Sequence, residues 1–98
     1  MKKRIILSAE AKQDIAELKR YIRHELKMPD TAARYIKELN AVIQELPNHA
    51  DSVGMNEYIQ GMFGFNARHA IFKRMIIIFY PKNHTIYIRR IIPGSLVY

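Results

Sequence analysis

The chain has 98 residues, 49% of them hydrophobic, and we expect one globular domain over residues 1–98. It contains no cysteine, which excludes disulfides, thiolate metal sites and a cysteine nucleophile. Sixteen Lys and Arg residues against nine Asp and Glu give a net charge of +7, which favours nucleic acid, a ribosome or an acidic protein segment as partner.

The apolar runs of the sequence are short. The run that begins at Ile5 stops at Ser8, far short of a signal-peptide core. No run approaches the ~18 residues of a membrane helix. We therefore expect a cytoplasmic protein with no membrane partner.

The first predicted elements are a strand and two helices. Arg4–Leu7 is short and contains two β-branched isoleucines, which indicates a strand, and Ser8 can cap the helix that follows. Apolar side chains at three- and four-residue spacing predict that this helix covers about Ala9–Glu25. A second such stripe predicts a helix capped by Asp30 and stopped by Pro47. The short turn between them predicts an antiparallel hairpin, not a DNA-reading helix-turn-helix with its short, steeply crossed helices.

The second half of the chain is rich in predicted strands. Residues 48–62 lack a clear period and indicate a loop, with a short helix or strand inside Met55–Gln60. Three strands and a turn follow: Phe65–Phe72, Met75–Tyr80, the turn Pro81–His84, and Thr85–Ile92. The order β-α-α-β-β-β predicts an α+β fold, with the helical hairpin packed on one face of a mainly antiparallel sheet. The first strand is expected at an edge or beside the last strand.

Five segments, in this order and spacing, resemble the RelE/ParE superfamily of bacterial toxins: Leu7–Ile15, Tyr21-Ile22, Thr31–Ile36, Ile77–Tyr80 and Ile88–Gly94. The resemblance covers the whole chain. It implies the toxin half of a type II toxin–antitoxin pair, bound by a cognate antitoxin through a partly disordered segment. Some members cleave mRNA in the ribosomal A site, and others poison DNA gyrase. Pro93-Gly94 departs from the His-Gly of many members, and only Ser95–Tyr98 follows it.

Metal-independent RNA cleavage requires a base, an acid and cations around one phosphate. The resemblance implies that these groups lie on the open sheet face opposite the helices. We predict catalytic roles for Arg68, His69, Arg90 and Tyr98, and phosphate or RNA binding by Lys73, Arg74 and Arg89. His69 is the best acid or base by residue type. The alternative is an ordinary solvent-facing charge for each basic residue, and a frayed end for Tyr98.

The orientation of the two neighbouring arginines stays open at this point. Strand alternation puts Arg90 on the face of Ile88 and Ile92, which leaves Arg89 on the open surface. The family pattern instead points to Arg90 as the functional arginine, and a bulge would reconcile the two. His24, His49 and His84 are interpreted as structural. No pair of histidines has metal-ligand spacing, so we expect no metal and no cofactor.

Three functions remain. The first, which is the leading prediction, is a ribosome-dependent mRNA endoribonuclease, because strong basicity suits contact with the ribosome and RNA. The second is a non-enzymatic inhibitor of DNA gyrase, in which the helical hairpin and the tail make the contacts. The third is a degenerate, non-toxic module that binds an antitoxin. In all three cases we expect a small, acidic cognate antitoxin as a partner.

Overall fold

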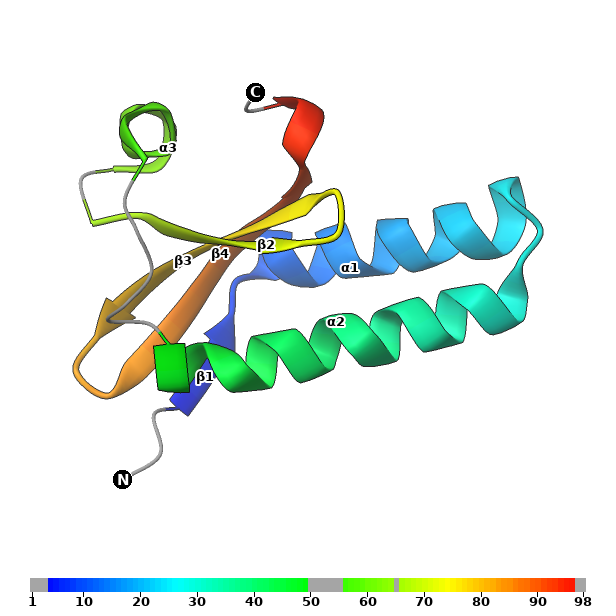
Figure 1. The fold of residues 1–98 in the computed structure, drawn as a ribbon, viewed down its shortest axis with the longest axis horizontal. Helices are drawn as coiled ribbons and strands as arrows, with labels where there is room; N and C mark the ends of the chain where they lie inside the picture. Colours follow the sequence, from blue (N-terminus) through cyan, green and yellow to red (C-terminus); the bar gives the residue numbers. More distant parts are fainter. Residues whose placement is uncertain (1–3, 50–55, 65, 97–98) are drawn as a thin grey trace.

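A four-stranded mixed sheet with the strand order β1-β4-β3-β2 organises the protein (Figure 1). The computed structural model describes residues 4–49, 56–64 and 66–96. The elements are β1 (Arg4–Leu7), α1 (Ala9–Arg20), the π-helical turn η1 (Tyr21–Glu25), α2 (Pro29–His49), α3 (Glu57–Phe63), β2 (Arg68–Phe72), β3 (Met75–Lys82), β4 (Thr85–Pro93) and the short helix η2 (Gly94–Leu96). The predicted α+β class and the order of its elements are confirmed.

The last three strands form the predicted antiparallel meander. β1 pairs in parallel with β4 and forms one edge of the sheet. The first strand therefore lies both at an edge and beside the last strand, the two positions expected from the sequence. The predicted turn is shorter than expected, because β3 continues to Lys82, which pairs directly with Thr85. Asn83 and His84 alone make the turn, with φ values of 48° and 59°. Two positive φ values match the right-handed twist of the paired strands.

The first helix confirms the predicted start and refines the predicted end. The Ser8 hydroxyl accepts a hydrogen bond from the Ala11 amide at 2.9 Å, which caps α1 as expected. The regular helix ends at Arg20, and η1 carries the chain on to Glu25. At its end the Leu26 amide donates to the Tyr21 carbonyl, five residues back. The predicted range is therefore helical throughout, with a wider last turn.

Both predicted ends of the second helix were wrong. The helix begins at Pro29, so Asp30 lies in its first turn and is not the cap. Proline suits the first helical position, because the amide it lacks has no partner within a helix there. Pro47 lies inside α2, which continues to His49. Pro47 costs the helix one backbone hydrogen bond. The helix continues past it because the neighbouring Leu46 is only 3% exposed and packs the last turn against the core.

The region without a clear period contains a helix. The Asn56 side chain accepts hydrogen bonds from the amides of Tyr58 and Ile59 and caps the start of α3. The helix continues to Phe63, three residues past the range Met55–Gln60 in which a short helix or strand was expected. Met55 and Phe65, where predicted elements began, lie outside the described residues. β2 begins at Arg68, so the described strand is shorter than predicted.

Apolar clusters occupy both sides of the sheet. On the side covered by α1 and α2, here called the hairpin side, Leu39 and Ile43 pack with Phe79 and other sheet residues. On the opposite side, here called the α3 side, Ile59 is fully buried in a second cluster with Ile76 and its neighbours. The helices pack on one face as predicted, but the other face is not fully open, because α3 covers part of it. None of the described helices has the length and apolarity needed to cross a membrane.

Candidate functional site

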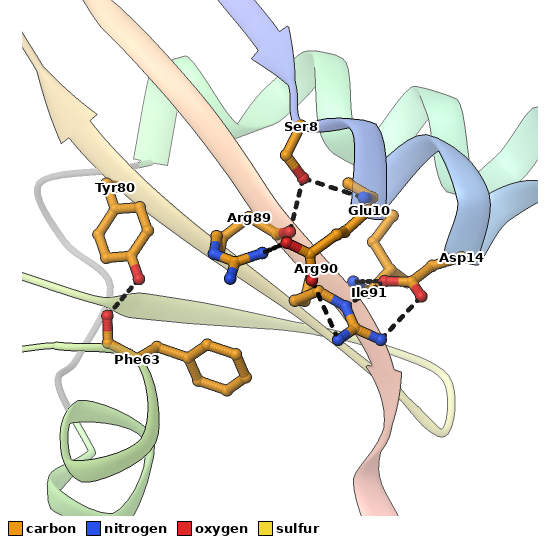
Figure 2. A network of polar contacts seen from close by, with 9 residues as sticks. Ser8, Glu10, Asp14, Phe63, Tyr80, Arg89, Arg90 and Ile91 are labelled. Atoms are coloured by element: carbon orange, nitrogen blue, oxygen red, sulfur yellow. Dashed lines mark hydrogen bonds and ion pairs between the residues drawn. The ribbon is translucent and has the colours of Figure 1, made fainter.

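A polar network fastens the start of α1 to the second half of β4 (Figure 2). The Ser8 amide donates to the Ile88 carbonyl at 2.9 Å, and the Ser8 hydroxyl donates to the Arg89 carbonyl at 2.7 Å. Because β1 ends at Leu7, this part of β4 has no partner strand on that edge. The first turns of α1 take the place of the missing strand.

Two carboxylates of α1 neutralise the two arginines of β4. Asp14 accepts from Arg90 Nε at 2.8 Å, from Arg90 Nη2 at 2.9 Å and from the Ile91 amide at 2.9 Å. The hydrogen bond with Asp14 raises the pKa of Arg90 above its ordinary value. Glu10 binds Arg89 and also lies 3.5 Å from Arg90 Nη1. Both guanidinium groups are therefore held by the protein itself.

A β-bulge decides the orientation of these arginines. Phe79 pairs with Ile88 and Ile78 pairs with Arg90, so Arg89 is the extra residue on β4. The alternation of β4 reverses there, and Arg90 shares the α3 side with Ile78. The bulge that would reconcile strand alternation with the family pattern is present.

The two predicted catalytic residues of β2 lie on opposite sides of the sheet. His69 pairs with Ile78, on the α3 side, and Arg68 pairs with Phe79, on the hairpin side. The Nδ1 atom of His69 is buried and has no hydrogen-bond partner among the described residues. Burial lowers the pKa of His69 below its ordinary value. His69 lies in one row with Ile78 and Arg90 across β2, β3 and β4.

The turn between β2 and β3 holds the remaining predicted phosphate ligands of this region. Lys73 Nζ is 2.8 Å from Glu38 of α2 and 5.0 Å from the centre of the Tyr35 ring. The hydrogen bond from Lys73 lowers the pKa of Glu38. The Arg74 carbonyl accepts from the Gly94 amide at 2.7 Å, which holds this turn at the end of β4. Lys73 is thus directed toward α2, away from His69.

The predicted site residues are only partly brought together. Arg89 and Arg90 are neighbours on β4, and His69 lies two strands away from Arg90 across Ile78, whereas Arg68 and Lys73 lie on the hairpin side. β2 and β4, which carry most of the predicted site residues, are not neighbours in the sheet, because β3 lies between them. Tyr98 lies outside the described residues. Within the described part of the chain, no three His, Asp or Glu side chains gather as metal ligands.

Sequence reasoning missed the groove beside this network. Two adjoining pockets of about 330 and 420 Å³ follow α1 along β4, and both are lined by Asp14, Glu17 and Arg90. The second pocket extends to Tyr21 and Pro93. The available signal was the spacing of Glu10, Asp14 and Glu17, which puts three carboxylates on one helix face.

The comparisons with known proteins agree with this architecture. A helical hairpin on a sheet made of an antiparallel meander and a parallel first strand is the arrangement of the RelE/ParE toxin superfamily, and this chain shares it. A chain from the chromosomal ParDE toxin–antitoxin system of P. aeruginosa superimposes with a TM-score of 0.77 and 15% identity, covering 93% of this chain and 95% of that one. At this identity the likeness concerns the fold alone.

The family itself follows from the sequence. Residues 5–98 match the family model of the ParE toxin of the type II toxin–antitoxin system parDE. No curated protein sequence gives a significant match. The chain belongs to the ParE toxin family and is the toxin component of a type II system, with a cognate antitoxin as its partner.

Proposed function

We propose that this chain inhibits DNA gyrase, which was the second of the three functions expected from the sequence. The observation that carries the proposal is the match of residues 5–98 to the ParE family model. It favours the ParE-type alternative over the leading prediction of ribosome-dependent mRNA cleavage. A cytoplasmic location belongs to the same proposal, because gyrase acts on the chromosome there.

The charges of the predicted cleavage site support the same choice. RNA cleavage needs cations that are free to surround one phosphate as charge develops. Arg89 and Arg90 are instead held by Glu10 and Asp14, and Lys73 binds Glu38. An incoming phosphate would have to displace these carboxylates before it could bind. Inhibition by surface contact requires no such rearrangement.

The tip of the helical hairpin is the surface we propose for gyrase contact. It extends beyond the sheet in Figure 1 and exposes the large apolar side chains of Tyr21, Leu26 and Met28. Exposed basic residues flank them: Lys19, Arg20, Arg23 and Lys27. An apolar centre with a charged rim is typical of protein-binding surfaces.

The cognate antitoxin is proposed to be acidic. The chain carries a net charge of +7, and a negatively charged segment would bind it faster and more selectively than a neutral one. Loss of co-elution between the toxin and the purified product of the neighbouring reading frame would contradict this part of the proposal.

The test is a supercoiling assay with purified toxin, DNA gyrase and relaxed plasmid. We expect loss of supercoiling and accumulation of cleaved plasmid. Met28→Asp is expected to weaken inhibition about tenfold, because it puts a charge in the apolar contact. Met62→Asp is the matched control, since Met62 on α3 is 50% exposed and Met28 is 51% exposed. It should stay within about twofold of the original chain.

Two results would overturn the proposal. One is normal supercoiling together with new mRNA 5′ ends at codon positions after induced expression, which would restore the endoribonuclease function. The other is normal supercoiling without growth arrest, which would leave a module that only binds its antitoxin.

A further inference from the structure

A separate pocket lies at the end of the β3–β4 hairpin, away from the arginine network. Its volume is about 460 Å³, within the range of small-molecule sites. Its lining residues are Asn66, Tyr80, Pro81, Lys82 and Tyr87. β2 begins opposite Phe79, so the last three residues of β3 have a partner strand on one side only. The pocket occupies the position that a longer β2 would fill.

Two tyrosines form the aromatic wall of this pocket. Tyr80 pairs directly with Tyr87 across β3 and β4. The Tyr80 hydroxyl donates to the Phe63 carbonyl at the end of α3, which fixes the ring (Figure 2). Tyr87 is 40% exposed, so its ring is available to a ligand. A fixed and an exposed aromatic ring side by side make a platform on which a flat ligand can stack.

The surroundings of the tyrosines are basic. Lys82 pairs with Thr85, and Thr85 pairs with Arg4 of β1, so an exposed cation lies on each side of β4. No Asp or Glu is among the residues that line the pocket. Lys82 and Arg4 therefore differ from Arg89 and Arg90, whose charges are neutralised within the protein. An anionic ligand can approach this end without displacing a carboxylate.

We propose that this pocket binds an unpaired nucleotide of single-stranded nucleic acid. The base would stack on Tyr87 and Tyr80, the Asn66 amide would bond the base edge, and Lys82 with Arg4 would hold the phosphates. An acidic peptide would use the cations but would leave the aromatic platform without a flat partner. The combination of rings, amide and cations thus favours a nucleotide. This inference is independent of the proposed action on gyrase.

The test is fluorescence anisotropy of the full chain with a labelled oligothymidylate of about 12 nucleotides. Tyr87→Ala is expected to weaken binding about tenfold, whereas Tyr87→Phe, which keeps the ring, should bind within about twofold of the original chain. Lys82→Ala is expected to lower the slope of log affinity against log salt by about 0.7, the value for one phosphate contact. An oligouridylate of equal length shows whether DNA or RNA is preferred, and binding of either supports the proposal.

Matched controls separate a specific site from general attraction. Tyr58→Ala removes a tyrosine of α3 that is 57% exposed, and Lys37→Ala removes an exposed lysine of α2. Both should bind within about twofold of the original chain. Equal binding of an abasic oligonucleotide, equal losses for Tyr58→Ala and Tyr87→Ala, or equal displacement by polyglutamate of the same charge would each overturn the proposal. Circular dichroism of every variant establishes that the fold is intact.

Discussion

Replacement of Asp14 by alanine tests whether the α1–β4 network holds the fold together. The Asp14 side chain is 11% exposed and accepts three hydrogen bonds, two from Arg90 and one from the Ile91 amide. Loss of the charged acceptor at the buried Ile91 amide costs about 1.5–3 kcal/mol. The Arg90 contribution is smaller, about 0.5–1 kcal/mol, because Arg90 is 33% exposed and can turn to Glu10. We therefore expect Asp14→Ala to lower the unfolding free energy by about 3 kcal/mol.

Urea or thermal unfolding followed by circular dichroism measures this loss. For a chain of this length, 3 kcal/mol corresponds to a decrease in melting temperature of roughly 15 °C. Asp14→Asn keeps an acceptor for Ile91 and is expected to lose about half as much. The control is Glu17→Ala, one turn further along the same helix face and exposed, with an expected change below about 0.5 kcal/mol. Equal losses for Asp14→Ala and Glu17→Ala would refute the reasoning.

Three smaller predictions concern histidines and turns. Burial lowers the pKa of His69 below its ordinary value of 6.5. As the pH drops below 6.5, the unfolded chain therefore takes up a proton that the folded protein does not, and the unfolding free energy decreases. His69→Gln should flatten this decline between about pH 7 and pH 5, and an unchanged profile would argue against it. His84→Gly should raise stability by about 0.5–1 kcal/mol in urea unfolding, because His84 has a φ of 59°. Lys73→Gly, at a φ of 54°, should gain less than His84→Gly, because it also loses the contacts with Glu38 and Tyr35.

Local signals in the sequence were sufficient for most of the fold. The Ser8 cap, the two apolar stripes and the short connections between strands predict the elements and their order, because each depends on residues close in the chain. The failures were local features that tertiary packing decides. Pro47 stays in a helix because Leu46 is buried beside it, and the helix after Asn56 is held by Ile59, which has no apolar period around it.

The candidate site was less predictable, because its contacts join distant positions. Asp14 and Arg90 are 76 residues apart in sequence, and Glu10 and Arg89 are 79 apart. No local pattern indicates that these charges meet. Strand alternation also failed after Ile88, since one bulged residue reverses every later position. The bulge puts Arg90 on the same side of the sheet as Ile78, and its functional role, which the family resemblance implies, stays a prediction.

The pairing of charges shows where the positive charge of the chain remains available. Among the described residues, carboxylates of the two hairpin helices bind Lys73, Arg89 and Arg90, so these three positive charges are neutralised within the protein. The cations outside these ion pairs include the basic rim of the hairpin tip and Lys82 with Arg4. Figure 1 shows the hairpin tip and the β3–β4 turn at opposite ends of the long axis. A protein contact at one end and a nucleic-acid contact at the other could therefore form together without competing for the same surface. If both proposals hold, Met28→Asp should leave oligonucleotide binding unchanged, because its charge lies at the far end from the tyrosine pocket.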